Sequence, residues 1–134
     1  MVRLGRVEDS LAHPALVAEE DGQIVGVLTY ILGTDSCEVL TLHAAERLRG
    51  VGTALLRAVG EVAARGGCSS LWLITTNDNL DALRFYQRRG FRLAELHAGA
   101  VDDSRARLKP EIPRTGSFGI DLRDELVLKK DLGR

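Results

Sequence analysis

The hydrophobic positions in the first part of the chain are grouped as in β-strands. Two apolar stretches, Leu16–Glu20 and Gln23–Leu32, flank Asp21-Gly22, a dipeptide that favours a tight hairpin turn in this setting. In the second stretch, apolar residues occupy both sets of alternating positions, so we expect both faces of this strand to be partly buried. Cys37–His43 is rich in residues that suit the middle of a sheet. Three strands are therefore predicted, the first two joined as a hairpin.

A helical spacing replaces this pattern after Gly50-Val51-Gly52. The apolar face of the predicted helix is made of Leu55, Leu56, Val59, Val62 and Ala63. Gly66-Gly67 is expected to end it. A second helix is predicted at Leu80–Arg89, between the capping residues Asn77-Asp78-Asn79 and a glycine, Gly90.

Further strands are predicted at Leu71–Thr75, Phe91–His97 and Asp124–Lys130. The segment Gly99–Gly119 contains two prolines and little periodicity, so we expect a long loop or arm. Hairpins followed by strand–helix–strand units indicate an α/β protein with a mixed sheet and helices packed on it. A chain of 134 residues fits one domain, predicted over residues 1–134.

Composition and charge exclude several classes of protein. With 18 basic and 19 acidic residues, the net charge of −1 argues against a general nucleic-acid binder. The two cysteines, Cys37 and Cys68, lie in apolar segments, which favours free thiols in a reducing cytosol over a disulfide framework. No apolar run approaches the roughly 20 residues of a membrane span. We expect a cytoplasmic, soluble protein.

The segment Arg47-Leu48-Arg49-Gly50-Val51-Gly52-Thr53 lies between a strand and a helix and carries the clearest chemical signal. Two glycines allow a ligand to approach the backbone, and the helix start and two arginines supply positive charge. This is an anion site suited to a pyrophosphate, although a tight turn with solvated arginines fits the same residues. Thr53-Ala54 excludes a Walker loop, and Leu55 excludes the three-glycine dinucleotide fingerprint.

This Arg-x-x-Gly-x-Gly pattern resembles the pyrophosphate loop of the GNAT acetyltransferases. A second element, Asn79-x-x-Ala82-x-x-Phe85-Tyr86 followed by Gly90-Phe91, is similar to the second signature of that family. Further stretches, Thr75–Asn79, Lys109–Pro113 and Arg123–Glu125, are similar to a bacterial subgroup without an established substrate. The resemblance implies a mixed, largely antiparallel sheet flanked by helices, with acetyl-CoA as cosubstrate.

The resemblance also implies which residues bind the cofactor. Backbone N–H groups of the loop would hold the pyrophosphate, and the backbone of Leu42 would pair with the pantetheine arm and the acetyl carbonyl. The implied cofactor-binding residues are Leu42, Arg47, Leu48, Arg49, Gly50, Val51, Gly52, Thr53 and Asn79.

Two residues are candidates for proton transfer. Tyr86 matches the general-acid tyrosine of the family and would protonate the leaving thiolate; the alternative is a structural tyrosine with a buried ring. Glu38, on the strand that leads into the loop, is the candidate base, and a rim glutamate with a water chain as base is the alternative. The three histidines lack the spacing of a metal site, so no metal is expected.

Three functions remain open from the sequence. The first is an N-acetyltransferase acting on a primary amine of a small molecule or peptide. The second is a catalytically silent acetyl-CoA-binding regulatory module, and the third is an unrelated α/β protein that binds a phosphorylated ligand. Only about fifteen residues precede the first predicted strand, fewer than this family usually has. We therefore expect either an upstream start or a homodimer, with Gly99–Gly119 crossing between chains.

Overall fold

The computed structural model describes residues 2–3, 6–7, 12–45 and 50–133. Six strands are hydrogen-bonded in the order β3-β4-β5-β6-β8-β7, while β1 (Val2–Arg3) and β2 (Arg6–Val7) pair with each other. The pairs β3–β4, β4–β5 and β7–β8 are antiparallel, and β5–β6 is parallel. The predicted α/β class with a mixed, largely antiparallel sheet is therefore confirmed. The chain forms two compact units, Ser10–Trp72 with Lys130–Arg134, and Leu73–Lys129 with Met1–Asp9.

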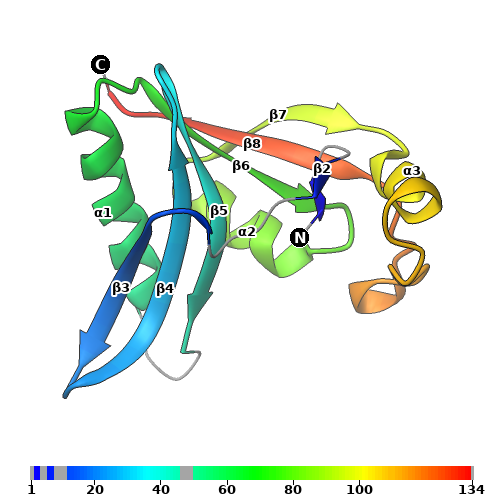
Figure 1. The fold of residues 1–134 in the computed structure, drawn as a ribbon, viewed down its shortest axis with the longest axis horizontal. Coiled ribbons are helices and arrows are strands. Elements are labelled where there is room, and N and C mark those ends of the chain that lie inside the picture. The colour runs from blue at the N-terminus through cyan, green and yellow to red at the C-terminus, as the bar shows by residue number, and fades with distance from the viewer. Residues whose placement is uncertain (1, 4–5, 8–11, 46–49, 134) are drawn as a thin grey trace. The chain divides into compact units, whose positions relative to one another are not determined.

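The first unit begins with the predicted hairpin. Strands β3 (Ala15–Glu20) and β4 (Gln23–Leu32) are joined by Asp21 and Gly22, whose φ angles of 51° and 79° are both left-handed. Such a two-residue turn matches the right-handed twist of the strands it connects. Strand β5 (Ser36–Ala44) then pairs with the other edge of β4, as Figure 1 shows.

Helix α1 (Val51–Arg65) packs on these three strands (Figure 1). Its buried residues, Leu55, Leu56, Val59 and Ala63, belong to the predicted apolar face. The start of the helix lies close to β4 because Gly26 has no side chain. A Cβ atom there would lie 2.6 Å from Val51 Cγ1 and 2.9 Å from Leu55 Cδ1, which is too close for any real contact. Gly26 therefore fixes how the start of α1 meets the sheet.

The second unit holds the end of β6 (Ser70–Thr76), then α2 (Leu80–Arg88), β7 (Arg92–His97) and β8 (Glu125–Asp131) as far as Lys129. Helix α2 and strand β7 are in contact. Phe91, between them, is only 3% exposed, and its ring meets that of Tyr86 edge-on with centroids 5.4 Å apart. The chain thus turns back into the core directly after the helix, as predicted.

The prediction of a loop or arm at Gly99–Gly119 is wrong for much of this segment. It contains helix α3 (Ala100–Arg107) and a short 3-10 turn, η2 (Ser117–Gly119). The helix has almost no apolar stripe, because its buried residues are Val101, Ser104 and Arg105. Side-chain hydrogen bonds to distant backbone stabilise it, and such bonds leave no periodic signal in the sequence.

Candidate active site

The start of α1 has the geometry of an anion site. The residue before the helix, Gly50, has a left-handed φ of 85°, and the Ala54 N–H donates to the Gly50 carbonyl over 2.9 Å. The first N–H groups of a helix have no acceptor within it, and the helix dipole makes this end positive. No acidic residue lies in the first turn, which begins Val51-Gly52-Thr53. These residues can therefore bind a phosphate group through backbone donors.

Gly50 is open on the side where other residues carry a side chain. A Cβ atom placed there would have no atom within 4 Å, and its φ disfavours every residue except glycine. The three residues before it that were predicted to bind the cofactor, Arg47, Leu48 and Arg49, lie outside the described residues.

Strand β5 presents the backbone of Leu42 at the edge away from β4. In an antiparallel pair, residues that exchange hydrogen bonds alternate with residues that do not. The Ala45 N–H donates to the Val25 carbonyl, and Leu42 lies three positions earlier, opposite Leu28. The N–H and C=O of Leu42 therefore point away from β4. This is the orientation needed for backbone pairing with an extended ligand.

Glu38 is buried in β5, with 3% of its surface exposed, and pairs with Ile31 of β4 and Trp72 of β6. Simple alternation would put it on the same face as Leu42. However, the register shifts between the pairs Thr29–Thr41 and Tyr30–Val39, so that β5 has one extra residue there. Directly paired residues share a face, so Glu38 lies on the face of Thr41 and Leu42 lies on the other. The burial of Glu38 contradicts its interpretation as a rim residue.

Asn79 and Tyr86 lie on α2. The Asn79 side chain caps the helix by accepting from the Ala82 N–H over 3.1 Å. The Tyr86 ring is half-buried between the edges of Phe85 and Phe91, with centroid distances of 5.2 and 5.4 Å. Burial disfavours the phenolate and raises the pKa of Tyr86 to about 12. Its hydroxyl therefore stays protonated at neutral pH and can act as a donor.

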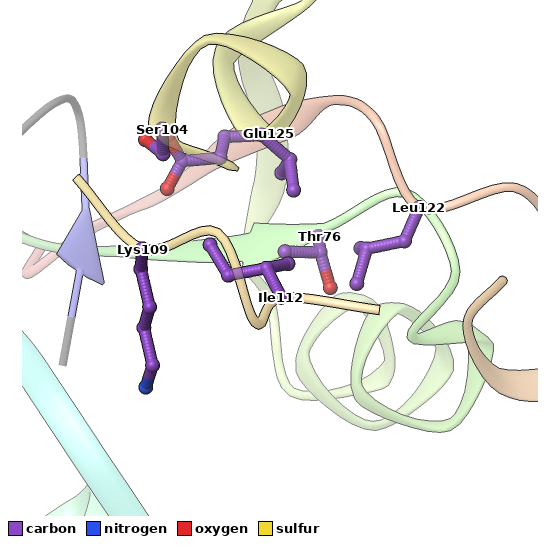
Figure 2. Close-up of a pocket in the computed structure, with 7 residues that line it drawn as sticks. Thr76, Ser104, Lys109, Ile112, Leu122 and Glu125 are labelled. Carbon is purple, nitrogen blue, oxygen red and sulfur yellow. The ribbon is translucent and has the colours of Figure 1, made fainter. Parts of the chain in front are cut away.

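The second unit contains a cavity of about 240 Å³, drawn in Figure 2. Its lining residues come from the end of β6, from α3, from the segment after α3 and from the start of β8: Thr76, Val101, Ser104, Lys109, Ile112, Leu122 and Glu125. Among the polar residues of this lining, Ser104 and Glu125 are the least exposed, at 3% and 4%. No feature of the sequence by itself predicted this cavity.

Asn77 and Asp78 have a role that the sequence interpretation missed. They were expected only to cap α2. Instead, the Asn77 side-chain oxygen accepts from the N–H groups of Arg123 and Asp124, both at 3.0 Å. The Asp78 carboxylate accepts from the Ser117 N–H at 2.8 Å. The signal was a run of three capping residues where one, Asn79, suffices.

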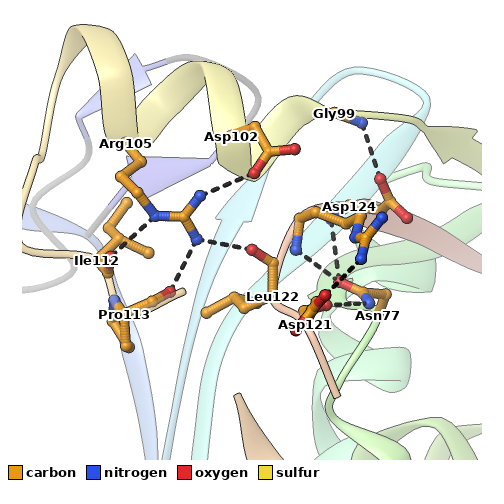
Figure 3. A network of polar contacts seen from close by, with 10 residues as sticks. Asn77, Gly99, Asp102, Arg105, Ile112, Pro113, Asp121, Leu122 and Asp124 are labelled. Atoms are coloured by element: carbon orange, nitrogen blue, oxygen red, sulfur yellow. Dashed lines mark hydrogen bonds and ion pairs between the residues drawn. The ribbon is translucent and has the colours of Figure 1, made fainter. Parts of the chain in front are cut away.

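Arg105 joins α3 to the segment that follows it (Figure 3). Its guanidinium donates to the carbonyl groups of Ile112, Pro113 and Leu122 over 2.7 to 2.9 Å. It also forms an ion pair with Asp102 at 2.8 Å, which offsets its charge. At 9% exposure, Arg105 is one of the buried charged residues of the chain. The walls of the cavity are thus fixed by polar contacts.

Comparison with known proteins identifies the family. The model of the acetyltransferase (GNAT) family matches residues 3–91, which include β3 to α2 and both signature segments. This chain belongs to the GNAT family. The resemblance inferred from the two signatures is confirmed, and an unrelated α/β protein is excluded.

Similar proteins extend the match. The chain is 46% identical over 113 residues to the uncharacterised Bacillus subtilis protein YxbD. The aligned part covers 84% of this chain and 70% of YxbD. The fold of this chain is similar to that of a GNAT acetyltransferase from Elizabethkingia anophelis with acetyl-CoA bound, with a TM-score of 0.77 and 21% identity over 91% of this chain and 78% of that one. It is also similar to a Bacillus subtilis acetyltransferase in complex with CoA, with a TM-score of 0.73 and 22% identity over 87% and 75% of the two chains.

Two absences hold for the part of the GNAT chain that the structure describes. There, no three or more His, Cys, Asp or Glu side chains are grouped so that they could hold a metal ion. Among the same residues, no helix is both long and apolar enough to cross a membrane. The cysteines Cys37 and Cys68 are buried and are not joined in a disulfide. Burial, together with the nearby Cys68 and Glu38, raises the pKa of the Cys37 thiol to about 11. The Cys37 thiol therefore stays protonated and is a poor nucleophile.

Proposed function

We propose that this GNAT acetyltransferase transfers the acetyl group of acetyl-CoA directly to a primary amine. The observation that carries the proposal is the start of α1. A left-handed glycine there follows the strand whose Leu42 backbone groups point away from β4. A pyrophosphate and an extended pantetheine arm need these two features. The solved relatives with acetyl-CoA or CoA bound support the choice of cosubstrate.

The proposed cofactor site uses backbone donors. The segment from Arg47 to Thr53 would bind the pyrophosphate, with Arg47 and Arg49 adding positive charge. The Leu42 N–H and C=O would pair with the amide groups of the pantetheine arm. Donors fixed by a sheet cost little reorganisation when charge develops on the acetyl oxygen. Asn79, already a helix cap, would contact the cofactor through its amide group.

The reaction requires an uncharged amine that attacks the thioester carbon. The bond from nitrogen to the acetyl carbon forms, the bond from carbon to sulfur breaks, and the amine loses one proton. We propose Glu38 as the group that receives this proton, directly or through water. Its place on β5, the strand that also carries Leu42, supports the role.

Tyr86 is proposed to assist the departure of the sulfur. A phenol with a pKa of about 12 is a weaker acid than an ordinary tyrosine. We therefore expect it to stabilise the developing thiolate mainly by hydrogen bonding from its O–H group. The neutral phenol is present throughout the neutral pH range, so no preceding protonation step is needed.

The proposal is tested by turnover with a panel of amines. Acetyl-CoA is mixed with the enzyme and each amine, and free thiol is measured over time. We expect thiol release that depends on the amine, together with an acetylated product in the mass spectrum. Tight CoA binding without amine-dependent thiol release would overturn the enzymatic proposal and favour a silent binding module.

We also propose that residues 1–134 work as a single domain, in the cytoplasm, as a homodimer. The exposed leucines of β7, Leu93 and Leu96, support association, because this strand lies at the end of the sheet. The Gly99–Gly119 segment is held within its own unit by Arg105, which does not support the predicted crossing between chains. Light scattering at micromolar concentration tests the dimer, and a stable monomer would overturn it.

A further inference from the structure

Three aromatic rings and one guanidinium group meet at the end of α2. The Tyr86 ring contacts that of Phe85 edge-on, with an interplanar angle of 87° and centroids 5.2 Å apart, and it contacts that of Phe91 at 70° and 5.4 Å. Phe91 is buried in the core, whereas Phe85 is only half-buried. Tyr86 therefore has one neighbour that the core fixes and one that needs further support.

Arg89 supplies this support. Its guanidinium carbon lies 3.6 Å from the centroid of the Phe85 ring, whose negative face attracts a cation. The Arg89 Nη1 atom also donates to the Phe85 carbonyl over 2.9 Å. Arg89 comes four residues after Phe85, about one helical turn, so the two side chains lie on the same side. One side chain thus holds both the ring and the backbone of Phe85.

The backbone fixes the point from which the Arg89 side chain extends. The N–H groups of Arg89 and Phe91 both donate to the Tyr86 carbonyl, over 3.0 and 3.1 Å. Gly90 between them has a left-handed φ of 93°, which lets the chain leave the helix at this point. Arg89 and Phe91 are therefore tied to the same carbonyl group, that of the tyrosine whose ring they help to enclose.

Arg89 acts on Tyr86 by packing rather than by charge. Burial is the cause that raises the pKa of Tyr86 to about 12, whereas a cation beside the hydroxyl would lower it. The charge of Arg89 is directed at the face of the Phe85 ring. Its effect on Tyr86 therefore passes through the position of that ring, which covers part of the tyrosine.

The position of the Tyr86 hydroxyl matters for its proposed role. A hydrogen bond to the departing sulfur weakens steeply as its distance and angle leave the favoured range. A misplacement of about 1 Å can cost roughly 100-fold in rate. The oxygen moves with the ring, so the contacts that fix the ring also fix the donor.

We propose that Arg89 is a positioning residue for Tyr86. By holding the Phe85 ring, it completes the pair of edge-on contacts that fix the tyrosine ring. This inference rests on the proposed role of Tyr86 in acetyl transfer and adds to it the residue that sets the place of the donor.

The position of the ring can be measured without turnover. The chain has two tyrosines, so ¹³C-labelled tyrosine in a Tyr30→Phe parent gives NMR signals from Tyr86 alone. The ring currents of Phe85 and Phe91 should displace these signals from those of free tyrosine. Arg89→Met should move them back toward the free value, because Phe85 is no longer held.

Arg88→Met is the matched control. Arg88 is the adjacent arginine at the end of α2 and is exposed, so its loss removes the same charge without uncovering Phe85. It should leave the signals and the rate unchanged. Arg89→Lys keeps a cation but loses the guanidinium fork, so it should recover part of the Arg89→Met loss. Circular dichroism checks folding, and if Arg89→Met does not fold, Arg89→Lys should show the same changes to a smaller extent.

A double-mutant cycle shows whether Arg89 acts through Tyr86. With acetyl-CoA and an amine acceptor, Arg89→Met should lower kcat by roughly 2- to 100-fold, which corresponds to the usual coupling between residues in contact. The KM for acetyl-CoA should be nearly unchanged. In Tyr86→Phe, the same substitution should lower kcat no further, because the donor is already lost. Equal losses in both backgrounds would overturn the proposal, since they indicate a general structural effect.

The two measurements separate this proposal from the proposed activity. If the parent enzyme releases no thiol with any amine, the activity is overturned, and the NMR signals alone decide whether Arg89 positions the ring. Thiol release together with signals and rates that are the same in Arg89→Met and Arg88→Met would overturn the positioning role and leave the activity standing.

Discussion

Helices α1 and α3 both begin after a left-handed glycine, but different forces hold them. Gly50 before α1 has a φ of 85°, and Gly99 before α3 has a φ of 75°. Helix α1 buries four apolar residues against three strands. Helix α3 instead depends on Arg105 and on the Asp124 carboxylate, which accepts from the Gly99 N–H at 2.8 Å. An apolar stripe is a local property, whereas the anchors of α3 come from distant positions.

The same difference distinguishes the helices that carry the family signatures from the helix that lines a cavity. The helices that were predicted from periodicity, α1 and α2, carry both signatures of the GNAT family. Helix α3 and the segment after it form the walls of a cavity in the second unit. We therefore expect changes in α1 and α2 to alter cofactor binding and chemistry. We expect changes in α3 to alter stability.

The largest expected effect is that of Tyr86→Phe on α2. Turnover should fall by roughly 10- to 10,000-fold, the usual worth of a positioned proton donor, with CoA affinity nearly unchanged. The pKa of Tyr86 is about 12, so the group stays protonated until the pH approaches that value. The ratio of wild-type to variant rates should therefore be constant from about pH 7 to 10.

Tyr30→Phe is the matched control, since the chain has two tyrosines and Tyr30 lies in β4. It should turn over like the wild type. An unchanged rate in Tyr86→Phe with a good acceptor would remove Tyr86 from the mechanism.

The two left-handed glycines test the comparison directly. Gly50→Val should weaken CoA binding by roughly 100-fold or more, because valine resists this φ and its side chain enters the phosphate site. Gly99→Val meets the same strain, of roughly 1–2 kcal/mol, but should leave CoA binding unchanged. Isothermal titration with CoA measures both. Gly52 belongs to the same predicted cofactor segment but does not have a left-handed φ. Gly52→Val should therefore weaken CoA binding only through the added side chain. Equal CoA affinity in Gly50→Val and wild type would refute the loop assignment.

Substitution of one buried residue in each helix compares the stability that apolar packing gives α1 with the stability that hydrogen bonds give α3. Leu55→Ala should lower the free energy of unfolding by roughly 2–5 kcal/mol through a cavity under α1. Arg105→Met should lower it by about 3 kcal/mol, because three carbonyl groups lose their donor. Urea unfolding followed by circular dichroism measures both changes.

Arg107→Met is the control for Arg105 on the same helix. Arg107 is exposed and pairs only at the surface with Asp103, at 2.8 Å. Such a pair contributes roughly 0–1 kcal/mol. If Arg107→Met destabilised the protein as much as Arg105→Met, general charge on α3 would matter more than the buried anchor.

The smallest expected effect comes from a glycine inside α1. A Cβ atom at Gly60 would lie 3.6 Å from Leu132 Cδ2 and 3.9 Å from Leu71 Cδ1, which are ordinary contacts. Gly60→Ala should therefore raise the free energy of unfolding by roughly 0.5–1 kcal/mol. Gly26→Ala should lower it instead, because its Cβ would meet Val51 at 2.6 Å. The same unfolding curves decide whether the two signs differ.

Most strands and both periodic helices could be predicted from the sequence. The hairpin at Asp21-Gly22 and the bounds of β4 are as predicted, and α1 ends at Arg65, directly before Gly66. These features depend on neighbours within a few residues, so local preference and the tertiary structure agree. The two signatures are likewise short stretches of consecutive sequence, which is why the family could be inferred.

Other features needed the tertiary structure. The extra residue in β5 shifts Glu38 to the face of Thr41, because a bulge depends on the partner strand. Arg105 could not be told from the other arginines until its carbonyl partners, Ile112, Pro113 and Leu122, were known. The sequence by itself determined the periodic elements and the two family signatures. Only the tertiary structure decided which polar residues are buried, because burial depends on chain segments that are far apart in sequence.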